Sequence, residues 1–225
     1  MVSKKFYGWA FVLAVAAMAF LFIAARLYDD YKFASIERTV RGFSTESDET
    51  RLLLAYGDAF GKENPFEFCD ALELNARRQA DRGYALVNRL REFEKANLLA
   101  DYEQVRRQYY LNNFELWLQR TVAKRECSQF NPELQKNSTL VLFFTDTLSS
   151  CNDCIVQGEL LDQLREKCPQ LQVITLASDL KIAPVELLKK KFGVQSVPSI
   201  VVDNSKTTSG AKTREELVRE LGCSA

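Results

Sequence analysis

Cys151 and Cys154 constrain this chain more than any other feature, because only two residues separate them and an apolar run, residues 140–144, comes shortly before. A short run of this kind predicts a buried strand. If a helix begins at the cysteines, their spacing places both sulfurs on one helical turn, close enough to form a disulfide. The N-terminus of such a helix presents unpaired N–H groups and the positive end of a dipole, which favour a thiolate over a thiol. The pattern is therefore typical of thiol–disulfide exchange.

The composition excludes several kinds of site. The 225 residues include no histidine, which rules out His-based catalytic triads and zinc sites with histidine ligands. The 30 basic and 30 acidic residues give a formal net charge of zero, which offers no support for a nucleic-acid surface. No second Cys-x-x-Cys completes a zinc ligand set, so we expect no metal, and we expect no nucleic acid among the partners.

Residues 1–26 are predicted to be an N-terminal membrane anchor, because residues 6–25 contain no charged side chain. A helix of about 20 residues spans roughly 30 Å, the thickness of the hydrocarbon core of a bilayer. A cleaved signal peptide is the alternative, but its apolar region is usually roughly 7–15 residues long and ends at small residues. Here the bulky Phe22 and Ile23 occupy the −3 positions of the two candidate cleavage sites, so we favour a retained anchor.

Lys4 and Lys5 precede the apolar run, and basic flanks favour the cytoplasmic side of a membrane. We therefore expect a single-pass membrane protein with a cytoplasmic N-terminus and an extracytoplasmic body. An even number of cysteines, six, agrees with such a location, since disulfides persist mainly outside the cytosol.

Residues 27–127 are predicted to be an α-helical region, because they contain one proline, few glycines and many strong helix formers. We expect a first helical segment that restarts near Ser47, followed by helices over residues 66–96 and 101–126 that form an antiparallel hairpin or short bundle. The charges on these helices have mixed signs, and we interpret them as a solvated outer face.

Two cysteines of this region are expected to pair. Cys69 lies about as far before the predicted turn as Cys127 lies after it, so the two face each other at the open end of the hairpin. We predict a disulfide between them, which needs Cα atoms within about 7 Å. Two separate buried thiols are the alternative.

Residues 128–137 are predicted to be a linker, and residues 138–225 a domain in which strands and helices alternate. Thr213 and Glu216 have the spacing of a capping box at the start of the last helix. The expected order is a strand at 139–144, a helix at 151–167, a strand at 171–176, a helix at 184–192, a strand at 199–202, a short strand within 205–210 and a helix at 213–221.

This order of elements, with Cys-x-x-Cys opening the first helix, resembles the thioredoxin-like superfamily over about residues 138–225. A second feature carries the resemblance, the Val197-Pro198 dipeptide before the strand at 199–202. The resemblance implies a central mixed sheet with helices on both faces. We therefore expect an α/β thioredoxin-like domain preceded by a transmembrane helix and an α-helical hairpin or bundle.

The resemblance also implies roles for individual residues. Cys151 would be the exposed nucleophile and Cys154 the less exposed resolving thiol. Pro198 would be cis and lie beside the cysteine pair, where the main chain of Val197 would bind an extended substrate segment.

In the thioredoxin-like arrangement, the first and last helices of the domain lie on one face of the sheet and run parallel. Cys168 and Cys223 lie at their C-terminal ends, remote from the cysteine pair. The resemblance therefore implies a structural disulfide between them, with two free thiols as the alternative.

Three residues depart from the pattern of the superfamily. Ser150 stands where a tryptophan is common before the first cysteine. Asp146 is the nearest candidate for the acid that often lies on the preceding strand, but it falls after the apolar run. Asp153, between the cysteines, should disfavour a thiolate by like-charge repulsion, which predicts a moderate or reducing couple.

We therefore expect a membrane-tethered, extracytoplasmic thiol–disulfide oxidoreductase, leaning towards reductase or isomerase, that acts through Cys151 and Cys154 without a bound cofactor. Its expected partners are cysteine-containing secreted or membrane proteins and a membrane redox partner. The alternative is a redox-inactive binding or assembly module that uses the Val197-Pro198 groove. A purely structural disulfide, or half of a metal site, is a third interpretation.

Overall fold

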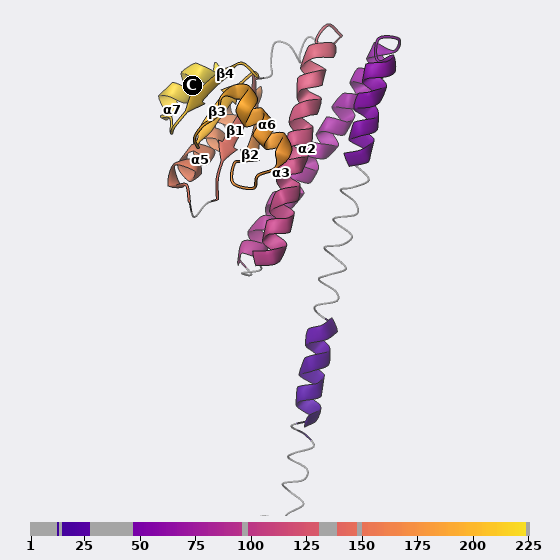
Figure 1. Ribbon diagram of the computed structural model, residues 1–225, viewed down its shortest axis with the longest axis vertical. Coiled ribbons are helices and arrows are strands. Elements are labelled where there is room, and N and C mark those ends of the chain that lie inside the picture. The colour runs from indigo at the N-terminus through magenta and orange to yellow at the C-terminus, as the bar shows by residue number, and fades with distance from the viewer. Residues whose placement is uncertain are drawn as a thin grey trace, which may run out of the picture. The chain divides into compact units, whose positions relative to one another are not determined.

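The computed structural model of the protein describes residues 13, 15–27, 47–95, 99–130, 139–147 and 150–223 (Figure 1). The chain divides into two compact units, Met1–Glu46 and Ser47–Ala225. The predicted turn of the helical hairpin and most of the predicted linker lie outside the described residues, as do residues 28–46.

In the N-terminal unit, residues 15–27 form a helix whose apolar side chains are exposed. Among the residues that the structure describes, no helix is both long and apolar enough to cross a membrane. The prediction of a single-pass anchor is therefore wrong, and with it the predicted cytoplasmic N-terminus and extracytoplasmic body. The remainder of residues 1–26 lies outside the described part of the chain.

The second unit begins with three helices. A helix spans residues 47–60 and is followed by α2 (Pro65–Lys95) and α3 (Leu99–Glu126). Pro65 suits the first position of α2, because the missing N–H would have no partner within the helix there. At Gly57 the first helix approaches α2 so closely that a Cβ atom would collide with the ring of Phe68. An apolar cluster that includes Phe68, Leu72 and Ala123 closes this end of the bundle.

A largely buried polar layer joins the first turn of the first helix to the middle of α2 and to α3. Its members come from all three helices and satisfy one another, as buried polar groups must. Such a layer fixes the register of packed helices, because sliding one helix would leave these groups unpaired. The pairs are Ser47 with Glu115, Gln79 with Glu115 and with Gln119, and Asn75 with Thr50 and with Gln119.

The sheet has four strands in the order β2-β1-β3-β4. Strand β1 pairs in parallel with β2 and antiparallel with β3, and β3 pairs antiparallel with β4. The strands are β1 (Thr139–Thr145), β2 (Leu171–Ala177), β3 (Ser199–Val202) and β4 (Lys206–Ser209).

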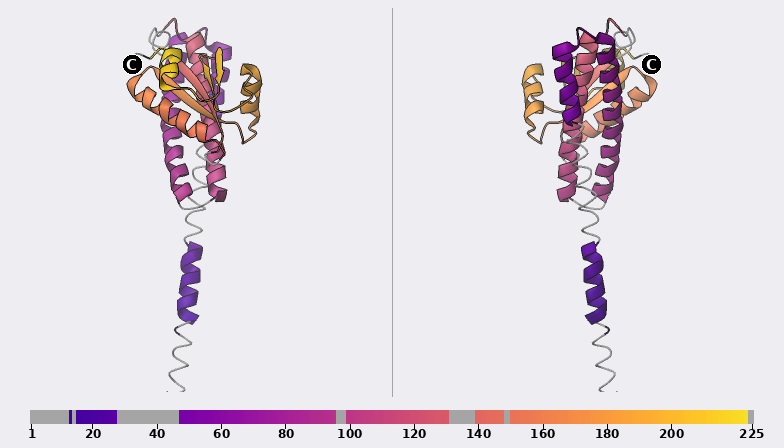
Figure 2. Two further views of the ribbon diagram at one scale, coloured as in Figure 1. Left: turned by 90° about the vertical axis from the view of Figure 1, so that its left-hand side faces the viewer. Right: turned by 90° about the vertical axis from the view of Figure 1, so that its right-hand side faces the viewer.

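Alternating side chains of β1 enter two separate cores, because successive residues of a strand point to opposite faces. Val141 and Phe143 pack against α5 (Asn152–Lys167) and α7 (Arg214–Leu221). Leu142 and Phe144 pack on the other face, against α6 (Ala183–Phe192) and also against α3. Figure 2 shows α6, in gold, on the opposite side of the sheet from α5 and α7.

The side of the sheet that carries α6 is covered by α3 as well. Tyr110 and Trp117 of α3 share a core with β1 and β2. The Asn113 amide donates a hydrogen bond of 2.9 Å to the Thr175 carbonyl of edge strand β2. The Trp117 indole N–H donates at 2.7 Å to Asn204 in the turn between β3 and β4. Further contacts join Asn204 to Thr121 at 3.0 Å, Lys124 to Asp203 at 2.7 Å and Arg106 to Asp179 at 2.6 Å.

The predicted fold class, an α/β thioredoxin-like domain preceded by a transmembrane helix and an α-helical hairpin or bundle, is therefore wrong. The described chain is mostly helical, its mixed sheet is small, and α3 belongs to the same core as the sheet. The prediction that the charges of these helices form a solvated outer face is also wrong for Arg106. That side chain is only 4% exposed, because it forms its ion pair with Asp179 against the sheet.

Candidate functional site

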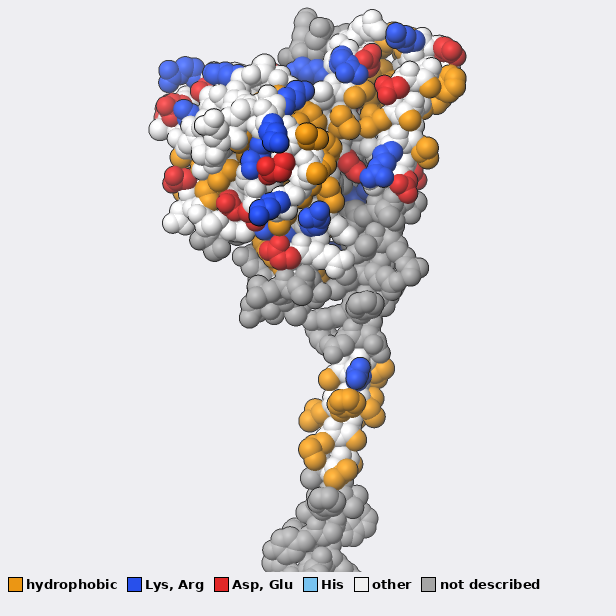
Figure 3. Space-filling view, viewed as in Figure 1, with side chains coloured by type: hydrophobic (Ala, Val, Ile, Leu, Met, Phe, Trp, Pro, Cys, Tyr) orange, Lys and Arg blue, Asp and Glu red, His pale blue; other side chains and the backbone are white. Residues whose placement is uncertain are grey.

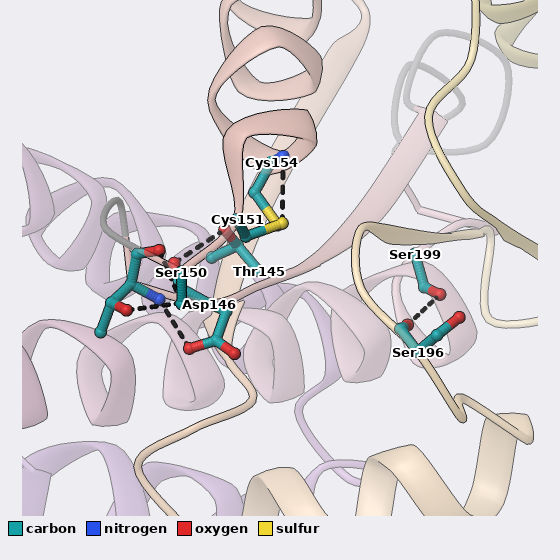
Figure 4. The surroundings of a disulfide bond; sticks show 8 residues. Thr145, Asp146, Ser150, Cys151, Cys154, Ser196 and Ser199 are labelled. Carbon is teal, nitrogen blue, oxygen red and sulfur yellow. Dashed lines mark hydrogen bonds between the residues drawn. A yellow bond between two sulfur atoms is a disulfide. The ribbon is translucent and has the colours of Figure 1, made fainter.

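Cys151 and Cys154 form a disulfide at the start of α5, with their Cα atoms 5.2 Å apart (Figure 4). Cys151 is the N-cap residue of the helix, and its sulfur accepts the backbone N–H of Cys154 at 3.2 Å. The Cys151 side chain is half-buried, whereas Cys154 is 3% exposed in the core between α5 and the sheet. The helix therefore offers one sulfur to solvent and shields the other.

Hydrogen bonds around Ser150 close the turn before the disulfide and position Cys151. The backbone N–H groups of Ser150 and Cys151 both donate to the Thr147 carbonyl, at 3.0 and 3.2 Å. The hydroxyls of Ser150 and Thr147 are 2.6 Å apart. Ser150 therefore closes the turn that leads into α5.

Val197 and Pro198 lie on the loop that leads into β3 and are joined by a cis peptide bond. Val197 and Cys151 both pack against the apolar cluster that contains Cys154, so the structure brings these three sequence-predicted residues together. The Ser199 hydroxyl anchors the loop by donating to the Ser196 carbonyl at 2.6 Å. In Figure 4 this loop and the Ser150 turn flank the disulfide from opposite sides.

The remaining four cysteines form two further disulfides, so none of the six is free. Cys69 is paired with Cys127, with Cα atoms 5.7 Å apart, and ties the start of α2 to the end of α3. Cys168 is paired with Cys223, with Cα atoms 5.9 Å apart, and joins the C-terminal ends of α5 and α7. The expectation that the chain contains disulfide bonds is confirmed.

The two acids near the disulfide lie at the surface of the site. Asp146 follows the end of β1, and its carboxylate accepts the Thr147 N–H at 2.7 Å. Asp153 is exposed in the first turn of α5. No aspartate or glutamate is fully buried in the described part of the chain, so no buried acid lies beneath Cys154 there.

Gln157 is a buried residue of the site that the sequence analysis missed. It lies one turn after Cys154 on α5, and its side-chain oxygen accepts the Lys212 N–H at 2.6 Å. This hydrogen bond holds α5 against the segment before α7. A polar residue three positions after a buried cysteine lies on the same helix face, and this spacing was the available signal.

A cavity of about 300 Å³ lies beside Cys154, between α3 and α5, and we call it the α3–α5 cavity. Tyr102, Tyr109 and Tyr110 of α3 contribute aromatic lining, and Asp162 of α5 contributes a carboxylate. Burial raises the pKa of Tyr109 and of Tyr110, because a phenolate would be poorly solvated there. Residues of α3 therefore belong to the surroundings of the disulfide, which the sequence analysis did not predict.

The described residues contain no group of three or more histidine, cysteine, aspartate or glutamate side chains placed to hold a metal ion. What the site can do chemically rests on its disulfide. Comparison of the chain with protein-family models gives no match, and comparison with curated proteins gives none.

Proposed function

We propose that this chain is a thiol–disulfide oxidoreductase of thioredoxin type that acts on protein disulfides through Cys151 and Cys154. One observation carries the proposal: the disulfide caps a helix with one sulfur partly exposed and the other buried. With this asymmetry, Cys151 can react with the substrate, and Cys154 can resolve the mixed disulfide that forms.

In the reduced protein, the Cys151 thiolate attacks one sulfur of a substrate disulfide. A bond forms between Cys151 and that sulfur, and the other substrate sulfur leaves and takes up a proton. Cys154 loses its proton and attacks Cys151, which forms the intramolecular disulfide and releases the second substrate sulfur as a thiol. Two electrons pass to the substrate, and a dithiol donor must reduce the pair again.

Cys151 is suited to the first step for two reasons. The positive end of the α5 dipole favours a thiolate at the N-cap, and the Cys154 N–H already points at the Cys151 sulfur from 3.2 Å. Cys154, at 3% exposure, is too buried to meet a folded substrate, but it lies one turn away from Cys151. The loop of Val197 and Pro198 would bind the main chain of the substrate beside Cys151.

Asp153 favours the reducing direction. Its exposed carboxylate lies in the first turn of α5, two residues from Cys151, and like charges disfavour a thiolate there. A reduced form that is less stabilised gives up its electrons more readily. We therefore propose a reductase or isomerase rather than a strong oxidant.

Insulin reduction tests the proposal. The full chain, with dithiothreitol as electron donor, should speed the precipitation of insulin, and Cys151→Ser should abolish the acceleration. Val156→Ala is the matched control, since Val156 is on the same helix and 55% exposed, and it should behave as the wild type. Reduced Cys154→Ser, freed of dithiothreitol and then mixed with insulin, should instead accumulate a mixed disulfide that migrates as a separate, reductant-sensitive band.

Two outcomes would overturn the proposal. If the wild type is no faster than dithiothreitol alone, the chain does not catalyse exchange, and a binding module that uses the Val197 loop becomes the better explanation. If Cys151→Ser is as active as the wild type, the exchange occurs at another disulfide.

A further inference from the structure

The α3–α5 cavity lies beside the disulfide, on the side away from the Val197 loop. The sheet order β2-β1-β3 places β1 between β2 and β3. The cavity is lined by Val173 and Thr175 of β2, whereas Val197 leads into β3. A substrate cysteine at Cys151 would therefore have the Val197 loop on one side and the α3–α5 cavity on the other.

The charges that line this cavity are mainly negative. Among the described residues, Asp146, Glu159 and Asp162 contribute carboxylates, and the one guanidinium in the lining is that of Arg106. The Arg106 charge is already compensated by Asp179 at 2.6 Å and by Glu103 at 3.5 Å, neither of which lines the cavity. Asp162 pairs in turn with Arg165, outside the lining, at 3.4 Å, but the five carboxylates of this group still outnumber its two guanidinium groups. A second cation is thus favoured in the cavity, and an anion is not.

The remaining lining suits a cation with an apolar stem. Tyr102, Tyr109 and Tyr110 offer aromatic surface, and the faces of aromatic rings attract cations. Arg106 illustrates this, since its guanidinium lies 5.7 Å from the centre of the Tyr110 ring. A volume of about 300 Å³ is at the lower end of ligand pockets, and it suits one side chain better than a cofactor.

We propose that the α3–α5 cavity selects disulfide substrates that carry a lysine or arginine beside the target cysteine. This inference rests on the proposed function and adds its substrate class. The formal net charge of the chain is zero, so the overall charge gives no preference for a cationic substrate. The preference comes from the carboxylates that line the cavity. On the face seen in Figure 3, basic and acidic side chains of the second unit are interspersed rather than segregated.

The test uses disulfide-linked peptides that are identical except for lysine, glutamine or glutamate next to the cysteine. The rate constant for reduction by the reduced full chain is measured for each peptide and divided by the rate constant with dithiothreitol, which removes the effect of charge on the peptide itself. An exposed charge pair typically contributes a factor of up to about five, so two carboxylates predict a lysine-to-glutamate ratio of about ten.

Two variants identify the residues responsible. In Glu159→Gln with Asp162→Asn, the ratio should fall to within about twofold of unity, because two of the three carboxylates are neutralised. Glu166→Gln removes one negative charge from the exposed face of α5 outside the cavity, and should keep the ratio.

Equal normalised rates for the three peptides with the wild type would overturn the inference while leaving the proposed function intact. An unchanged ratio in the doubly neutralised variant would overturn it as well. If the wild type reduces no peptide at all, the proposed function fails and the inference fails with it.

Discussion

Replacing Trp117 with phenylalanine would test whether the helices and the sheet unfold as one unit. Trp117 lies on α3, is 5% exposed, and packs in the same core as Leu142 and Phe144 of β1. Its indole N–H donates at 2.7 Å to Asn204 in the turn between β3 and β4. Phenylalanine keeps most of the buried ring and cannot donate this hydrogen bond.

The expected loss of unfolding free energy for Trp117→Phe is about 2 kcal/mol. Removing the donor leaves the partly exposed Asn204 oxygen without its partner, which costs about 1 kcal/mol. The smaller ring buries about 40 Å² less apolar surface, which costs about 1 kcal/mol more at roughly 25 cal/mol per Å². Trp117→Ala should cost more, about 3–5 kcal/mol, because it also leaves a cavity.

Urea unfolding of the full chain measures this change with two probes. Far-UV circular dichroism follows mainly the helices, and hydrogen exchange of the β1 and β3 amides follows the sheet. With an m-value of about 2 kcal/mol/M, both should shift by about 1 M. Val156→Ala, at an exposed position of α5, should stay within about 0.5 kcal/mol. If only one probe shifts, the helices and the sheet are independent and the shared core was misjudged.

Three further predictions concern other parts of the second unit. Replacing Cys69 and Cys127 by alanine should lower the unfolding free energy in urea by about 4 kcal/mol, because the disulfide closes a loop with a sequence separation of 58; a loss under about 1 kcal/mol would contradict this. Burial raises the pKa of Tyr110, so its contribution to stability is present below its unfolded pKa near 10 and is lost at higher pH. The slope is about 1.4 kcal/mol per pH unit, and pH-dependent melting should show a smaller alkaline loss for Tyr110→Phe. The backbone hydrogen bond from Thr213 lowers the pKa of Glu216, so its stabilisation is present above its unfolded pKa near 4.5 and is lost as the pH falls. The difference in melting temperature between the wild type and Glu216→Gln should therefore shrink on acidification, and a constant difference would argue against the capping box.

Much of the sheet and its helices could be predicted from the sequence. The strand expected over 139–144 is β1, which ends one residue later, and the helix expected over 151–167 is α5, which begins one residue later. These bounds could be predicted because each depends on a few neighbouring residues: a short apolar run for the strand, and a pair of cysteines at the start of the helix. The capping box of Thr213 and Glu216 is present for the same reason.

The packing of α3 against the sheet could not be predicted, because α3 buries two faces. Ala123 faces the cluster shared with α2, whereas Tyr110 and Trp117 enter the core of the sheet. A helix buried on two sides shows no single apolar stripe, so its periodicity does not reveal a second partner. Asn113, a polar residue of the same helix, also faces the sheet, and its amide donates to the Thr175 carbonyl of edge strand β2.

The membrane anchor was predicted from composition alone. An apolar run of residues 6–25 shows that no charge interrupts it, but not where a regular helix begins and ends. The described helix covers residues 15–27 and includes Arg26.

The arrangement of α3 brings a second helix, besides α5, to the cavity of the proposed substrate selection. Both reacting sulfurs come from α5 and its N-cap, and these are held by contacts within α5 and the preceding turn. The tyrosines of the α3–α5 cavity come from α3, which the Arg106–Asp179 ion pair helps to fix to the loop after β2. Substitutions on α3 should then change which peptides are reduced, while the reaction of Cys151 with a small disulfide stays the same. The helical region would in that case share the determination of specificity with Glu159 and Asp162 of α5.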